Sequence, residues 1–361
     1  MAVAPEPGEL IGGRYRLIEV AGRGGMADVW RAEVEGDLGF RRTVAIKQMH
    51  PGLAGQPTYV QMFVEEARLG AALESPNLAE VRDFIAHRGN YYMVLEWVEG
   101  IDLGTWVRWH FERGEAPRWE LVAAIGVGVL RGLAAAHERH VGGVAAPVVH
   151  RDVSPHNVML TTRGLAKLID FGLALAADRT ADATEPGVVK GKMAYLSPEI
   201  VSGARPVPAS DQFAVGSVMW EALVGRKLFD GANDYETYVR VRDCQVPPLK
   251  PLRPDVPADV AALIARALAP RVDQRYPSAR EFARQLGTAL KKVQLRRDLH
   301  ALLSRSVSDA RASMGLGART GDLSALTPIA ELRPEEQATA FGDRLRGLRH
   351  KLPGLFGRKK S

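Results

Sequence analysis

Three short segments carry acids, an amide and a lysine at spacings that suit the transfer of a phosphoryl group. Asp152 follows His-Arg and precedes Asn157 by five residues in HRDVSPHN, Asp170 lies in LIDFG, and Lys47 ends VAIK. Asp152 could orient an attacking hydroxyl and accept its proton, while Asn157 and Asp170 could coordinate a magnesium ion that bridges phosphates. Any one of these residues alone would more commonly be a helix cap, a turn former or a solvated lysine.

Two further features would complete a nucleotide site. Gly22 and Gly24 lie in AGRGGMADVW between two strand-like runs, and glycines there allow the backbone to approach phosphate oxygens. Lys47 needs an acid to hold it toward those phosphates. We expect this acid to be Glu66 on the following helix, because the helical phase of Glu65 points elsewhere.

These residues need a scaffold of strands followed by helices. Residues 14–50 contain β-rich runs, residues 58–73 place apolar residues at helical spacing, and residues 91–98 indicate another strand. Beyond a glycine-containing segment near 99–104, apolar helices are predicted at 119–138, 210–224, 258–269 and 278–293. We therefore expect an α+β protein whose small β-rich lobe holds one helix, whose larger lobe is helical, and whose ligand cleft lies between the two.

The ordered motifs closely resemble the bacterial branch of the eukaryotic-like (Hanks-type) serine/threonine protein kinases. The shared positions, within about 14–287, are Gly22, Gly24, Val29, Lys47, Glu66, His150-Arg151-Asp152, Asn157, Asp170-Phe171-Gly172 and Ser197-Pro198-Glu199. The resemblance implies a bilobal kinase that uses ATP and Mg²⁺, or Mn²⁺, and phosphorylates protein serines and threonines. We divide the chain into an N-terminal extension (1–13), an N-lobe (14–98), a C-lobe (99–290) and a basic, largely disordered tail (291–361).

The resemblance also assigns the nucleotide pocket. Leu95 would be the gatekeeper before a hinge in which the backbones of Glu96 and Val98 bond adenine. Asp102 would meet the ribose hydroxyls, although a helix N-cap is the alternative for this aspartate. The other residues implied to line the pocket are Val20, Val29 and Ala45.

Structural and regulatory positions follow from the same resemblance. Asp211 would hold the backbone of the catalytic loop, and Arg275 would pair with Glu199 in a contact that is costly to break from one side. Arg151 would meet a phosphorylated activation loop. The candidate phosphorylation sites in that loop are Thr180 and Thr184, for which solvated loop threonines are the alternative.

Three positions depart from the family pattern. Ala27 replaces the third glycine of the loop, where a positive φ would be costly. Ser154 replaces the catalytic-loop lysine, and Lys192 replaces the threonine that packs beside Asp152 in the family. We hypothesise that Lys192 supplies the missing charge, because the transition state needs a cation in place and not from a given backbone position. The alternative is that Lys192 points to solvent and activity is weak.

Two other functions remain possible at this point. A pseudokinase would bind nucleotide or a partner without catalysis, but a scaffold has no use for the retained Asn157 and Asp170 as a magnesium pair. A small-molecule kinase would lack the long segment from the activation loop to Asp211, which resembles a platform for a peptide. We therefore expect an active protein kinase in bacterial signalling, with autophosphorylation and a homodimer as further expectations from the resemblance.

The composition leads us to expect a cytoplasmic protein whose basic residues are concentrated in the tail. The net charge is +6, yet residues 291–361 alone contain 15 Lys and Arg against 7 Asp and Glu, so no nucleic-acid ligand is indicated. The last twenty residues could contact an acidic membrane surface or a partner, or simply be solvated. A single cysteine, Cys244, and the lack of a signal-peptide pattern or a long apolar run fit a cytoplasmic protein.

Overall fold

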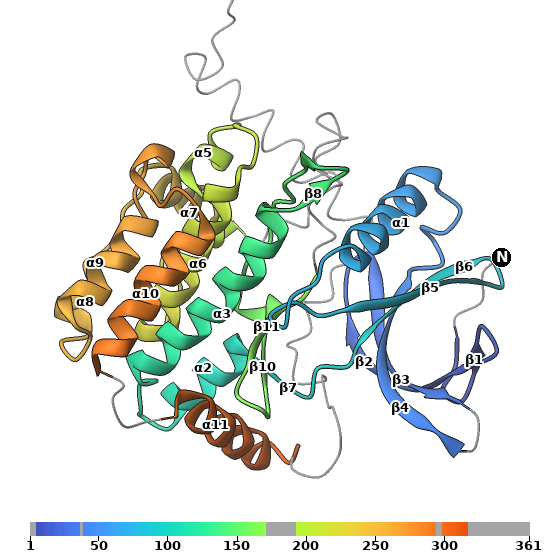
Figure 1. The fold of residues 1–361 in the computed structure, drawn as a ribbon. Helices are drawn as coiled ribbons and strands as arrows, with labels where there is room; N and C mark the ends of the chain where they lie inside the picture. Colours follow the sequence, from blue (N-terminus) through green and yellow to red (C-terminus); the bar gives the residue numbers. More distant parts are fainter. Residues whose placement is uncertain (1–4, 37–38, 171–192, 294–297, 317–361) are drawn as a thin grey trace, which may run out of the picture.

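The computed structural model describes residues 5–36, 39–170, 193–293 and 298–316, which form two lobes (Figure 1). The smaller lobe is a twisted antiparallel sheet with one helix, and the larger lobe is mainly helical. Residues 97–99 form the strap that joins the two lobes. The α+β, bilobal architecture expected from the sequence is confirmed.

The sheet of the smaller lobe has the strand order β1-β2-β3-β4-β6-β5. Its strands are β1 (Leu10–Ile11), β2 (Tyr15–Arg23), β3 (Ala27–Glu35), β4 (Arg41–Met49), β5 (Val81–His87) and β6 (Asn90–Glu96). Successive side chains alternate between the two faces. Val44 and Ile46 of β4 pack in an apolar cluster on one face, whereas Met49 packs in a second cluster with Phe63 of α1 (Pro57–Ala71).

The smaller lobe also includes residues that precede the boundary expected at residue 14. Gly8 donates a backbone hydrogen bond to Leu17 (2.7 Å), β1 pairs with β2, and Ile11 is fully buried. The sheet therefore begins before residue 14, because a two-residue strand gives too short a pattern to be read from the sequence.

The larger lobe is organised around α3 (Trp119–His137) and α6 (Pro208–Val224), which are buried on nearly all sides. The other helices are α2 (Leu103–Glu112), α5 (Pro198–Val201), α7 (Asp234–Arg242), α8 (Leu249–Leu252), α9 (Ala258–Ala267), α10 (Ala279–Val293) and α11 (Leu299–Ser313). The short strands are β7 (Gly100–Asp102), β8 (His140–Val141), β9 (Val144–Ala145), β10 (Val158–Thr161) and β11 (Ala166–Leu168). The sheet β11-β10-β7 lies where the larger lobe meets the strap.

Helix α3 satisfies the length and composition of a membrane-spanning segment, with a mean hydropathy of 1.5 over its most apolar window. However, 78% of that window is buried inside the protein. The helix therefore has the environment of a core helix, and its apolar surface is covered by the larger lobe itself.

The expectation of a largely disordered segment from residue 291 is wrong for its first part. Helix α10 continues to Val293, and α11 packs Leu299, Leu303 and Val307 into the main apolar core. These residues recur every four positions, which is the spacing of one helical face. Their pattern is hard to see because polar or small residues fill all but one of the positions between them. Residues 317–361 lie outside the described part of the chain.

Candidate active site

The turn between β2 and β3 is shaped by Gly24. Its amide donates to the carbonyl oxygen of Ala27 (3.0 Å), and a Cβ on Gly24 would lie only 2.9 Å from that oxygen. Ala27 itself begins β3 and is not among the described residues with positive φ, so the strain considered for it does not arise. The imidazole of His50, which the sequence analysis missed, bonds the carbonyl oxygen of Gly24 (2.8 Å) and ties the turn to the end of β4.

Sheet register brings together Val29, Ala45 and Leu95 of the apolar residues predicted for the nucleotide pocket. Gly22 pairs with Val29, Val29 with Lys47, and Ala45 with Leu95. Ala45 and Lys47 are two residues apart on β4, so their side chains share the face that lies toward α1. Val20 of β2 pairs with Trp30 and packs against the apolar cluster of Val44 and Ile46 on the other face, so its predicted place in the pocket is wrong.

Lys47 is held by two acids. Its Nζ lies 2.6 Å from Glu66 Oε1 of α1 and 3.2 Å from Asp170 Oδ1, and its side chain is only 13% exposed. Burial by itself lowers the pKa of Lys47, but the charges of Asp170 and Glu66 outweigh burial and raise the pKa above its usual value. The lysine is therefore a cation at neutral pH. Glu65 lies on another side of α1, where it accepts a bond from Gln61.

The strap has its own ion pair at the end of β6. Glu96 accepts a bond from Lys167 Nζ of β11 (2.9 Å), a lysine that the sequence analysis did not consider. The Glu96 amide donates to the carbonyl oxygen of Glu80 (2.8 Å), so a bond from this residue to adenine would use its carbonyl oxygen. Val98 follows within the strap, and Leu95 is half-buried and comes directly after the buried residues Tyr92–Val94 of β6.

The side chain of Asp102 has the contacts of a helix N-cap. Its Oδ1 accepts from the Thr105 amide (3.0 Å) and lies 3.1 Å from His156 Nδ1, while its Oδ2 accepts from the Thr105 hydroxyl (2.5 Å). Asp102 is 3% exposed, so the alternative of an N-cap describes its observed contacts. A contact between this aspartate and ribose stays a prediction. His156 is more than half exposed beside it.

Asp211 of α6 holds the backbone of the catalytic loop. Its two carboxylate oxygens accept from the amides of His150 and Arg151, each at 2.8 Å, and it is 1% exposed. The imidazole of His137 donates to the same carboxylate (2.7 Å). Arg151 adopts a φ of 65°, a conformation that is costly for this residue type and that the bonds to Asp211 sustain.

Asp152 and Asn157 are joined across the loop. The Asn157 Nδ2 donates to the Asp152 carbonyl oxygen (2.7 Å) and to Asp152 Oδ2 (2.9 Å). Ser154, between them, is 7% exposed and accepts the Asn157 amide at its carbonyl oxygen (3.0 Å). These bonds fix the carboxylate of Asp152 in one orientation within a buried loop.

The hairpin β10–β11 places Asn157 and Asp170 near each other, since Val158 pairs with Leu168 and the Ile169 amide donates to the Asn157 carbonyl oxygen (2.9 Å). Because Nδ2 of Asn157 donates to Asp152, its amide oxygen is the atom suited to a cation. Together with the Asp170 carboxylate it provides hard oxygen donors, which fit magnesium. Asp170 has a φ of 58°, a strained conformation of the kind that clusters at active sites.

Glu199 and Arg275 form a bidentate pair in the larger lobe. The Arg275 Nη1 and Nη2 atoms lie 2.8 and 2.7 Å from the two Glu199 carboxylate oxygens. The Arg275 side chain is fully buried and also donates to the carbonyl oxygens of Ala269, Ala209 and Pro270. The pair joins the segment before α6 to the segment before α10.

Several predicted residues lie outside the described part of the chain: Phe171, Gly172, Thr180, Thr184 and Lys192. The described residues contain no group of three or more His, Cys, Asp or Glu side chains that could bind a metal ion. The metal site predicted above needs no such group, because it combines one amide and one carboxylate.

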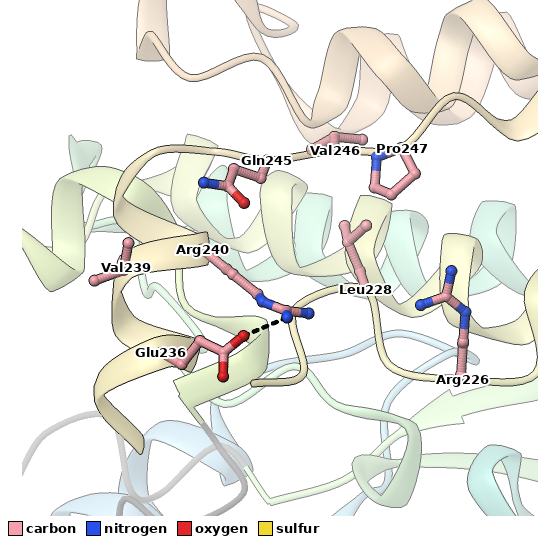
Figure 2. Close-up of a pocket in the computed structure, with 8 residues that line it drawn as sticks. All are labelled: Arg226, Leu228, Glu236, Val239, Arg240, Gln245, Val246 and Pro247. Carbon is pink, nitrogen blue, oxygen red and sulfur yellow. Dashed lines mark hydrogen bonds and ion pairs between the residues drawn. The ribbon is translucent and has the colours of Figure 1, made fainter. Parts of the chain in front are cut away.

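A pocket of about 600 Å³ lies in the larger lobe, between α7 and the chain segments that directly precede and follow this helix (Figure 2). It is lined by Arg226, Leu228, Glu236, Val239, Arg240, Gln245, Val246 and Pro247. Glu236 and Arg240 pair with each other across one turn of α7, as Figure 2 shows. None of the residues predicted to carry chemistry lines this pocket, so the candidate active site is the cluster between the lobes.

Comparison with known proteins agrees with this geometry. Residues 15–286 match the family described as Protein kinase domain. Serine/threonine-protein kinase PknA of Mycobacterium tuberculosis is 35% identical over 286 residues, which cover 78% of this chain and 62% of PknA. Tyrosine-protein kinase MasK of Myxococcus xanthus is 37% identical over 279 residues, which cover 77% of this chain and 43% of MasK. The chain thus spans about half the length of these two curated relatives.

The crystal structure of the Mycobacterium tuberculosis PknI kinase domain has a TM-score of 0.58 and 26% sequence identity, and the match covers 79% of this chain and 99% of that one. The family match includes both lobes, the Lys47–Glu66 pair and the loop from His150 to Asn157. This chain therefore belongs to the protein kinase family.

Proposed function

We propose that this chain transfers the γ-phosphoryl group of ATP to serine and threonine hydroxyls of proteins. The observation that carries the proposal is the position of Lys47, buried and charged between Glu66 and Asp170. Burying a lysine with two carboxylates has a large desolvation cost, and a protein that only binds partners gains nothing from it. A kinase uses the same lysine to hold the α- and β-phosphates of ATP.

Each residue of the cluster has a role that its contacts support. Asp152, oriented by Asn157, would accept the hydrogen bond of the attacking hydroxyl. The turn at Gly24 would bring backbone amides close to the phosphates. The Asn157 amide oxygen and the Asp170 carboxylate would hold Mg²⁺, or Mn²⁺, which neutralises phosphate charge when it is bound.

The charge that Ser154 does not supply is assigned to Lys192. Ser154 is buried two positions after Asp152, where the family pattern has a lysine. We infer that Lys192 reaches the γ-phosphate from its own segment, since a lysine is a point charge on a flexible stem. A weakly active protein is the alternative, and the paired substitutions described in the Discussion separate the two.

The proposal includes regulation and partners. Phosphorylation of Thr180 or Thr184 would add about −1.5 to −2 charge that could pair with Arg151. Autophosphorylation between two copies of the chain, bacterial signalling in the cytoplasm, and contact of the C-terminal residues with a membrane surface or a partner are further parts of the proposal.

The test is incubation of the purified chain with ATP and magnesium, followed by mass spectrometry of the chain and of a generic protein substrate. We expect phosphoserine and phosphothreonine. Because MasK is described as a tyrosine kinase, the same spectra must be searched for phosphotyrosine. Phosphotyrosine alone would refute the proposed acceptor, and no phosphate on any residue would refute the proposed activity and favour a nucleotide-binding scaffold.

A further inference from the structure

Helix α11 lies beyond the residues that match the kinase family, yet it is part of the folded larger lobe. Its residues Leu299, Leu303 and Val307 are each 7% exposed or less and belong to the same core cluster as Trp106 of α2. Figure 1 shows α11 against α2, close to β10 and β7. A helix packed in this way is fixed relative to the strands that it covers.

Polar bonds set the position of α11 along its whole length. The indole of Trp106 donates to the Ser306 hydroxyl (2.9 Å), and the Ser304 hydroxyl donates to the Thr162 carbonyl oxygen (2.6 Å). Near the start of the helix, the His300 imidazole donates to the Gly164 carbonyl oxygen (3.0 Å). A Cβ on Gly164 would lie 2.0 Å from the His300 carbonyl oxygen, so α11 rests directly on the turn between β10 and β11.

The last turn of α11 holds the strap between the lobes. Arg311 is 5% exposed, and its Nη1 donates to the Gly100 carbonyl oxygen (3.0 Å). Its Nη2 donates to the Leu316 carbonyl oxygen (3.2 Å) and lies 3.6 Å from Glu99 Oε1. A Cβ on Gly100 would lie 1.9 Å from the Leu160 carbonyl oxygen, so the start of β7, directly after the strap, passes too close to β10 for a side chain.

The strap therefore has a cation at each end. Lys167 bonds Glu96 where the strap begins, and Arg311 bonds Gly100 where it ends. The backbone groups that would bond adenine belong to Glu96, at the first of these ends, and to Val98, between them. A buried hydrogen bond from a charged donor to a carbonyl is among the stronger protein hydrogen bonds, so loss of Arg311 would leave one end of the strap less fixed.

We propose that Arg311 is a positioning residue for the nucleotide pocket, acting through the strap on the backbone groups that bond adenine. This inference rests on the proposed ATP site and assigns α11 to the catalytic domain. Arg311 would not touch the nucleotide. Its substitution would weaken ATP binding while leaving the chemistry at Asp152 intact.

The experiment compares the full chain with Arg311→Met, Arg311→Lys and Ser306→Ala. Ser306→Ala is the matched control, because it removes a half-buried polar contact of α11 with Trp106 and leaves the strap bonds in place. The dissociation constant for ATP with magnesium is measured by calorimetry. Hydrogen exchange is followed for the peptide covering residues 96–103, KM and kcat for ATP are measured, and Tm is measured for each variant.

We expect Arg311→Met to weaken ATP binding by about three- to tenfold, equivalent to about 0.7–1.4 kcal/mol, and to raise KM for ATP with little change in kcat. Exchange of the strap amides should become faster, and Arg311→Lys should restore part of both effects. Ser306→Ala should lower Tm without changing either. An unchanged ATP dissociation constant and unchanged strap exchange in Arg311→Met would overturn the inference, as would equal effects from Ser306→Ala. Absence of phosphoryl transfer by the parent chain would refute the proposed function alone, since binding and exchange do not depend on transfer.

Discussion

Replacement of Arg275 by methionine tests the buried ion pair with Glu199 in the larger lobe. The side chain is fully buried, and its loss would strand the Glu199 carboxylate, which is 15% exposed. Breaking a buried ion pair from one side costs about 3–5 kcal/mol. At about 2 °C per kcal/mol, the lower end of the range for large domains, Tm should fall by roughly 6–10 °C.

Two comparisons make this prediction specific. Arg271→Met removes an exposed pair with Asp273, and its Tm should match that of the parent. In Arg275→Met/Glu199→Met no charge is left unpaired, so the double variant should be more stable than Arg275→Met alone. Thermal unfolding by circular dichroism measures all four proteins. A Tm for Arg275→Met within 2 °C of the Arg271→Met value would refute the reasoning, a margin of about 1 kcal/mol.

The same pair makes a pH prediction. Burial alone raises the pKa of Glu199, but the bonds from Arg275 outweigh it, and the pKa lies below its usual value of 4.5. A carboxylate with a lowered pKa in the folded state stabilises the protein above that usual value, and this contribution is lost as pH falls further. The difference in Tm between the parent and Arg275→Met should therefore shrink below about pH 4.5. A constant difference down to pH 3.5 would contradict the assignment.

Three further predictions concern catalysis and α11. Lys47→Met should lower kcat/KM for phosphoryl transfer roughly a hundredfold or more, the size of effect seen when one preorganised donor is lost, while the variant stays folded at the assay temperature. If the variant kept a tenth of the parental kcat/KM, the role of Lys47 would be contradicted. Lys192→Met should lower kcat by about the same factor, and Ser154→Lys/Lys192→Thr should restore it; parental activity in Lys192→Met would refute relocation of the charge. His110 lies beside Ser306 of α11, with Arg113 and Glu115 nearby, and burial lowers the pKa of its imidazole. His110 is therefore protonated more readily in the unfolded chain than in the folded protein, so the free energy of unfolding should fall as pH drops below about 6.5. In His110→Gln, Tm should depend less on pH between 7.5 and 5.5. If the dependence of Tm on pH were unchanged, His110 would not be the group that causes it.

The helices of the core were predictable because their signals are local. Residues 119–138 and 258–269 anticipated α3 and α9 to within two residues, since their apolar spacing is sustained. The partner of Lys47 was also predictable, because helical phase separates Glu66 from Glu65. The remaining residues of the candidate site were predicted from the order and spacing of the motifs along the chain.

Other features depend on tertiary contacts that no local pattern contains. Lys167 is 71 residues from Glu96, and His137 is 74 residues from Asp211, so nothing in the sequence alone pairs them. Helix α11 was missed because polar or small residues interrupt the four-residue spacing of Leu299, Leu303 and Val307. Asp102 differs from these cases, because its N-cap contact with Thr105 is local and was the alternative that the sequence analysis gave beside ribose.

The most direct test of the central claim is transfer of the labelled γ-phosphoryl group of ATP, measured side by side for the parent chain and Asp152→Asn. The substitution keeps the shape of the side chain and removes the carboxylate that would accept the hydroxyl proton. We predict transfer by the parent, loss of about a hundredfold or more in Asp152→Asn, and the same ATP dissociation constant for both proteins. Equal transfer by the two proteins, or no transfer by the parent while it binds ATP, would contradict the account.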